Sequence, residues 1–130
     1  MKVVRSVGGV LTGFATMAIL MGLATPWLAQ RYTVEQFESF SMAYLLANLG
    51  CTVVAATLGG YLTALIAGRR EIPHAAALGF LTIGLSLYSM RQHGEARPGW
   101  YESTLAGCGP MAALVGAAIR MVTKRVKTVA

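Results

Sequence analysis

Charged side chains are scarce in this sequence. Only 12% of its 130 residues are Asp, Glu, Lys or Arg, while 55% are apolar. Soluble globular proteins carry about twice that share of charge. A chain with so few charged side chains cannot cover a surface that faces water. The composition therefore excludes an ordinary soluble domain and favours a protein that is surrounded largely by lipid.

Motifs that would carry chemistry are also missing. The sequence holds two cysteines and two histidines, and it has neither a phosphate-binding glycine loop nor a nucleophile with a neighbouring base. Two cysteines without further ligands do not complete the coordination shell of a metal. We predict a non-catalytic protein with no metal and no cofactor.

The sequence does contain four apolar runs, each long enough to cross a bilayer, for which roughly 17–25 helical residues suffice. They cover residues 7–29, 44–68, 73–90 and 104–122, and Arg120 is the one charged residue within them. The first run is too long for a cleaved signal peptide, and Trp27 stands where a cleavage site needs a small residue. We predict an all-α polytopic membrane protein with one domain, residues 1–130, whose four transmembrane helices form an antiparallel bundle.

The basic residues predict the orientation of these helices. If the amino terminus is inside, the inner segments hold eight basic residues: Lys2, Arg5, Arg69, Arg70, Arg120, Lys124, Arg125 and Lys127. The outer loops then hold three: Arg31, Arg91 and Arg97. This bias follows the positive-inside rule for short loops. We therefore predict a multi-pass protein of the bacterial cytoplasmic (inner) membrane with both termini in the cytoplasm. The net charge of +6 reflects this topology, and we predict no nucleic-acid partner.

The connections between the runs differ in length. Thr33 and Gln36 have the spacing of a capping box, which predicts that the second helix begins about two turns before its apolar run. Residues 91–103 contain Gly94, Pro98 and Gly99, which predict an irregular loop.

Small residues recur at every fourth position on the predicted helices. Such stripes let helix backbones approach closely in a membrane, where apolar burial gives little drive to associate. On the second helix they are Ala56, Gly60, Ala64 and Gly68, and on the fourth they are Gly109, Ala113 and Ala117. We predict that these residues pack the helices together.

Four other residues have two interpretations each. Asn48, the most polar side chain inside a span, is expected to make an interhelical hydrogen bond or to contact a ligand or ion. Cys51 and Cys108 lie at similar predicted depths, so they are either small buried residues or a disulfide. His74 opens the third helix at headgroup depth, where it is an interfacial residue or the axial ligand of a porphyrin.

The segments GGYLTALIAGRREIPHAAALGF and PGWYE and the basic tail resemble small four-helix proteins of bacterial inner membranes that have no assigned activity. The resemblance implies a fold and a location for nearly the whole chain.

The expected function is that of an accessory or scaffolding subunit, which packs against other membrane proteins or against further copies of itself. The alternative is a small homo-oligomeric transporter or channel lined by Asn48, Thr52, Thr57 and Tyr61. A third alternative is a subunit that carries a pigment or haem on His74. The first apolar run has no carboxylate, which argues against a small multidrug exporter.

Overall fold

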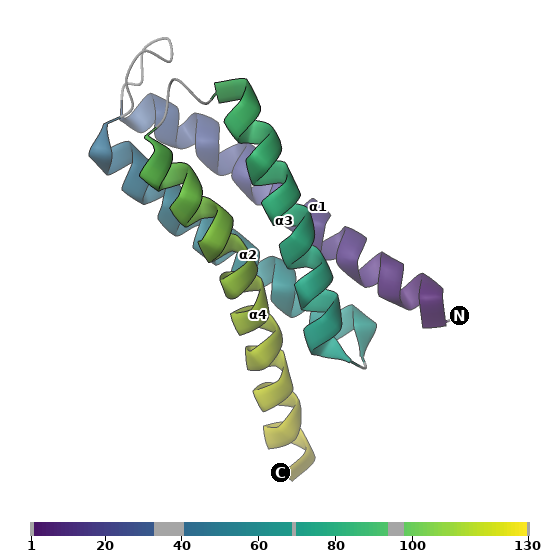
Figure 1. Cartoon of the computed structure of the whole chain (residues 1–130). Helices are drawn as coiled ribbons and strands as arrows, with labels where there is room; N and C mark the ends of the chain where they lie inside the picture. The colour runs from purple at the N-terminus through teal and green to yellow at the C-terminus, as the bar shows by residue number, and fades with distance from the viewer. Residues whose placement is uncertain (1, 33–40, 69, 94–97, 130) are drawn as a thin grey trace.

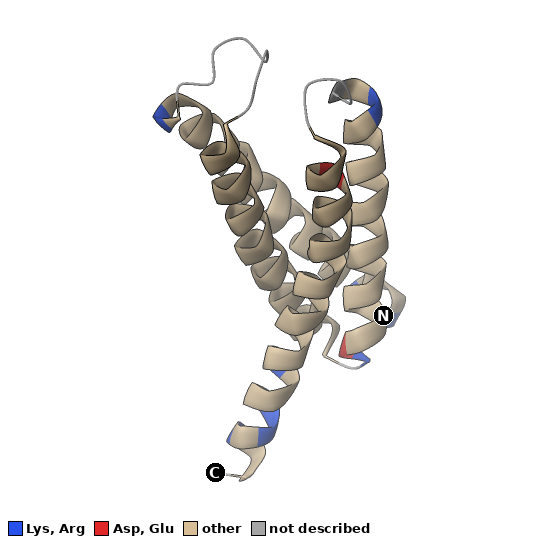
Figure 2. Ribbon diagram, turned by 60° about the vertical axis from the view of Figure 1, so that its left-hand side comes forward, with Lys and Arg blue, Asp and Glu red and all other residues tan. Residues whose placement is uncertain are grey.

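A computed structural model describes residues 2–32, 41–68, 70–93 and 98–129 of the chain. These residues form four helices: α1 (Lys2–Arg31), α2 (Met42–Ala67), α3 (Glu71–His93) and α4 (Gly99–Val129) (Figure 1). All four are long and apolar enough to cross a membrane. Figure 2 shows that the charged residues gather toward the helix ends and leave the middle of the fold uncharged. The protein is therefore an all-α, multi-pass membrane protein.

Helix α2 is the centre of the arrangement. It packs along α1 on one side and along α4 on the other, and α3 packs mainly against α4. Within the described residues, no Cα atoms of α1 and α4 lie within 8 Å of each other. Both termini and the turn between α2 and α3 lie toward the lower part of Figure 1, and the end of α1 and the start of α2 lie together at the upper part.

Glycines lie where the helices come closest. A Cβ atom added to Gly60 of α2 would collide with the backbone carbonyl of Ala113 on α4. A Cβ atom on Gly13 of α1 would lie 2.6 Å from the carbonyl oxygen of Gly59 on α2. On α3, a Cβ atom at Gly79 would lie 3.2 Å from the Cα atom of Pro110. The contacts at Gly60 and Gly13 need a residue without a side chain, and the contact at Gly79 is tighter than usual for a Cβ atom, as expected for small-residue packing in membranes.

The small-residue stripes lie largely inside the fold. The alanines of these stripes are fully buried: Ala56, Ala64, Ala113 and Ala117. Gly60 and Gly109 are also buried, and a Cβ atom on Gly109 would lie 3.3 Å from the hydroxyl of Thr82.

Gly68 has a different position from the one that the stripe predicted. It follows the last residue of α2 as the C-cap, with a left-handed φ of 68°, and its N–H donates to the carbonyl of Ala64 at 3.1 Å. Glycine is favoured here because it adopts a left-handed conformation without a steric penalty.

We expect Gly68→Ala to lower the free energy of unfolding by about 1 kcal/mol, since alanine is strained in the left-handed region. Unfolding by a denaturing detergent would measure this. Gly84→Ala is the control, because no atom lies within 4 Å of a Cβ at that exposed helical position. Equal effects of the two changes would contradict the capping role of Gly68.

The start of α2 corrects one prediction. Ser41 is the N-cap: its backbone is extended and its hydroxyl accepts a hydrogen bond from the N–H of Tyr44 at 3.2 Å. The helix therefore begins at Met42, because its first free N–H groups are already capped there. Thr33 and Gln36, which predicted an earlier start, lie outside the described residues.

The connection between α3 and α4 corrects another prediction. Residues 91–103 were expected to be irregular, but α3 continues to His93 and α4 begins at Gly99. The carbonyl of Pro98 accepts hydrogen bonds from the N–H groups of Tyr101 and Glu102, which closes the first turn of α4. Pro98 therefore lies just before α4, and Gly99 is the first residue of the helix. Both residues are tolerated at the start of a helix.

Candidate functional site

A cleft of about 220 Å³ lies among the four helices, and we call it the α1–α3 cleft. It lies beside α1 and α3, which pack against each other less than any other pair of helices in contact, and between α1 and α4, whose backbones stay further apart. Thirteen residues line it: Phe14, Met17, Ala18, Met21 and Thr25 of α1, Asn48 and Thr52 of α2, Thr82, Leu85, Ser86 and Ser89 of α3, and Leu105 and Gly109 of α4. None of these residues is charged.

Asn48 connects three helices at one side of this cleft. Its amide nitrogen donates a hydrogen bond to the hydroxyl of Tyr101 on α4, and its amide oxygen accepts one from Thr25 on α1 at 3.4 Å. The side chain is 5% exposed. Because both ends of the amide have protein partners, Asn48 is placed to hold α1, α2 and α4 together.

The hydroxyl groups around the cleft are occupied in part by their own helices. Thr52 donates to the carbonyl of Asn48 at 2.9 Å, and Thr82 donates to the carbonyl of Gly79 at 2.7 Å. The hydroxyl of Thr52 also lies 3.7 Å from the sulfur of Met21 on α1. The cleft is thus an apolar space with a few polar atoms, suited to an apolar group and not to an ion.

Tyr101 and Glu102 are the residues that sequence reasoning missed. The sequence places them in an outer loop, whereas the structure buries both in the first turn of α4, at 0% and 1% exposure. Trp100 packs edge-on against Tyr101, with ring centroids 6.1 Å apart. A carboxylate in the first turn is favoured by the helix dipole, so Glu102 after a Pro-Gly pair was the available signal for a helix start.

The two cysteines do not bond to each other. Cys51 and Cys108 are both free, partly buried thiols. Cys51 packs beside a cluster of buried residues that includes Leu28 and Tyr44. Neither cysteine lines a cavity found in the described part of the chain.

The structure places only two of the four residues that were expected to line a pore in the wall of the cleft. Asn48 and Thr52 line the α1–α3 cleft, but Thr57 and Tyr61 do not. The hydroxyl of Thr57 donates to the carbonyl of Val53 on its own helix at 2.8 Å.

His74 lies at the other end of the fold, beside a second cavity. Its Nδ1 atom lies 2.7 Å from the carbonyl oxygen of Arg70, and since a carbonyl oxygen only accepts, the hydrogen bond is donated by Nδ1. The cavity has a volume of about 880 Å³ and is lined mainly by polar and basic residues. A porphyrin needs apolar walls for its ring, and the described lining offers little apart from Ala67 and Gly68. The described residues also contain no group of three metal-binding side chains.

Comparisons with protein-family models, with curated proteins and with solved structures find no match to this chain. The case for its function therefore comes from its own residues.

Proposed function

We propose that this protein is a non-catalytic accessory or scaffolding subunit of a larger assembly in a bacterial cytoplasmic membrane. In this proposal the helices cross the membrane in alternating directions, with both termini in the cytoplasm. The excess of basic residues at the ends that hold the termini and the turn between α2 and α3 supports this orientation.

The α1–α3 cleft is the observation that carries the proposal. Its 220 Å³ is below the roughly 300–1,000 Å³ of typical small-molecule pockets, but it is enough for side chains of a neighbouring helix. Small and hydroxyl-bearing residues on its walls, such as Ala18, Ser86 and Gly109, are the types by which membrane helices associate. A helix of a partner subunit, placed between α1 and α3, would complete the packing of the bundle.

A small transporter is the second candidate, and the position of Asn48 in the cleft wall favours it. An amide and several hydroxyl groups could guide a neutral polar molecule. The absence of any charged residue from the part of the lining that the structure describes argues against coupling such transport to protons or cations.

We expect Ser86→Phe to disrupt the assembly, because the larger ring would fill the cleft that receives the partner helix. The measurement is the native mass of the protein after gentle detergent extraction, with mass spectrometry of the proteins that migrate with it. The wild type should migrate with other subunits, and Ser86→Phe should migrate as the free chain.

Leu87→Phe is the matched control, since Leu87 is the next residue on α3 and is 55% exposed outside the cleft. This variant should keep the mass of the wild type. A wild-type protein that migrates only as one chain, or as a ring of identical chains, would contradict the accessory role and favour transport.

A further inference from the structure

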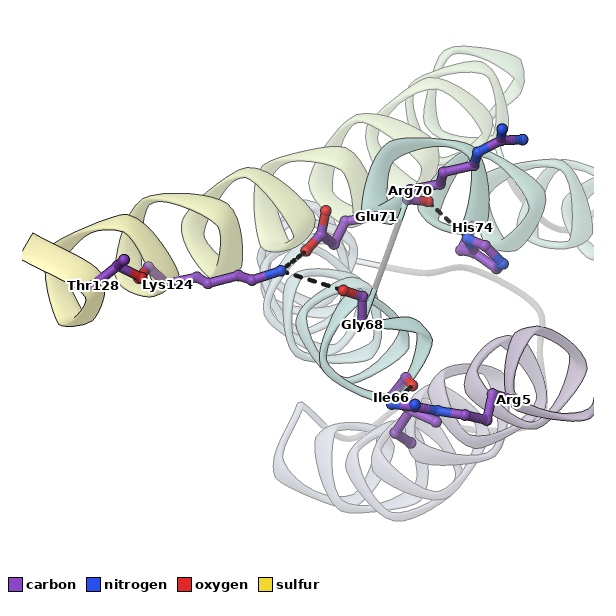
Figure 3. Close-up of polar contacts among 8 residues, drawn as sticks. All are labelled: Arg5, Ile66, Gly68, Arg70, Glu71, His74, Lys124 and Thr128. Carbon is purple, nitrogen blue, oxygen red and sulfur yellow. Dashed lines mark hydrogen bonds and ion pairs between the residues drawn. The ribbon is translucent and has the colours of Figure 1, made fainter. Parts of the chain in front are cut away.

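The second cavity, which we call the basic cavity, combines residues of three helices. It is lined by Lys2, Arg5 and Ser6 of α1, by Ala67 and Gly68 at the end of α2, and by Arg70 and His74 at the start of α3. Figure 3 shows Arg5 and the His74 ring on the two sides of this region, on α1 and α3. Its 880 Å³ lies within the range of ligand-binding pockets.

The positive charge of this cavity is not neutralised from within. Among the described residues, its lining includes Lys2, Arg5 and Arg70 and no acidic residue. Glu71, the nearest acid in the chain, instead pairs with Lys124 of α4 at 3.4 Å, on the other side of the turn (Figure 3). Lys124 also donates to the carbonyl of Gly68 at 3.2 Å, which fixes this ion pair against the end of α2.

Two helix N-termini add to the positive potential. Both α1 and α3 begin beside the cavity, and the first N–H groups of a helix favour an anion. Within the described residues, Arg5 donates one long hydrogen bond, 3.4 Å to the carbonyl of Ile66, which leaves further N–H donors of its guanidinium for a ligand. The contact of His74 Nδ1 with the carbonyl of Arg70 orients the ring, and Nε2 can donate to an anion only when the ring is in its imidazolium form.

We propose that the basic cavity binds an anionic phosphate group, that is, one whose negative charge is not balanced by a cationic headgroup such as choline. A phosphate presents several oxygen acceptors, and guanidinium and ammonium groups with helix N-termini are the donors that bind it best. The phosphate has two possible sources, an anionic lipid headgroup or a soluble phosphate. Basic pockets between membrane helices near the cytoplasmic surface bind anionic headgroups. The proposal is independent of the accessory role.

Native mass spectrometry of the full chain, purified without endogenous lipid, tests this site. The lipid probes are phosphatidylglycerol and phosphatidylcholine with the same acyl chains, and the soluble probe is inorganic phosphate. We expect one phosphatidylglycerol to be retained at least tenfold more tightly than phosphatidylcholine. Arg5→Gln and Lys2→Gln should each weaken this binding about fivefold, as expected for one basic group near an anionic headgroup.

Two variants separate binding from folding. Lys2 makes no side-chain contact with another helix that the described residues reveal, so Lys2→Gln tests the charge even if Arg5→Gln disturbs the contact with Ile66. Lys127→Gln is the matched control, because Lys127 is exposed near the end of α4 and lines neither this cavity nor the one next to Glu71.

The outcomes distinguish the sources of phosphate. Retention of phosphatidylglycerol that inorganic phosphate does not displace supports a lipid headgroup. Binding of inorganic phosphate that the same two substitutions weaken supports a soluble ligand. Equal retention of the two lipids without phosphate binding, or an equal loss in Lys127→Gln, would overturn the proposal.

Discussion

Gly60→Ala should lower the free energy of unfolding by about 3 kcal/mol, at the upper end of the usual cost of overpacking. The added methyl group would meet the backbone carbonyl of Ala113, and a backbone cannot rotate away as a flexible side chain can. The helices α2 and α4 would have to move apart along their whole contact. That separation would also loosen Ala56 and Ala64, which are fully buried in the same region.

The measurement is unfolding of the purified protein in mixed micelles, followed by loss of helix signal as denaturing detergent is added. Gly50→Ala is the matched control on the same helix. Gly50 is exposed, and no atom lies within 4 Å of a Cβ atom placed there. Since alanine is favoured over glycine in a helix by about 0.5–1 kcal/mol, this variant should be unchanged or slightly more stable. A similar loss in both variants would show that Gly60 does not set the distance between α2 and α4.

The helices and their close contacts were largely predictable because they depend on local sequence. Apolar length predicts a membrane span, and a four-residue spacing of small side chains predicts a face that can approach another backbone. Gly60, Ala64, Ala113 and Ala117 lie on such faces in the structure. Which stripe meets which helix was not predictable, because that depends on how the helices cross.

Helix ends were predicted less well because several signals compete there. Gly68 fits the small-residue stripe by spacing, but it is the left-handed cap of α2. The Pro98-Gly99 pair indicated a loop and instead opens α4, which carries Tyr101 into the interior. The partner of Asn48 could therefore not be identified from sequence, since it was assigned to a loop at the membrane surface.

The two cavities could not be predicted from the sequence for the same reason. The α1–α3 cleft arises because α1 packs along α2 while its backbone stays apart from that of α4, a property of the helix crossings. The basic cavity depends on the first turns of α1 and α3 lying on either side of the end of α2. The residues that line each cavity are far apart in the chain. The sequence shows whether each residue is polar or apolar, but not which of them lie together.

Asn48→Leu should lower the free energy of unfolding by about 1–2 kcal/mol, near the upper end of values for hydrogen bonds inside membranes. The substitution keeps an apolar volume but removes the amide that donates to Tyr101 and accepts from Thr25. Thr52→Val is the control in the same wall of the cleft. The hydroxyl of Thr52 donates to the carbonyl of Asn48 on its own helix at 2.9 Å and reaches another helix only through the sulfur of Met21 at 3.7 Å, a weak acceptor, so its loss should cost less than the loss of the Asn48 amide.

A double-mutant cycle with Tyr101→Phe separates the hydrogen bond from general disturbance of the core. If Asn48 and Tyr101 stabilise the fold through their shared bond, the double variant should cost less than the sum of the single variants, by about 0.5–1.5 kcal/mol. Additive costs would mean that the two residues act independently. Transport measured in vesicles that contain the same variants then tests the transport alternative. If Asn48 has only a structural role, the transport rate per folded protein should be the same in Asn48→Leu as in the wild type. A flux that vanishes in folded Asn48→Leu would instead assign the amide to a transport path through the α1–α3 cleft.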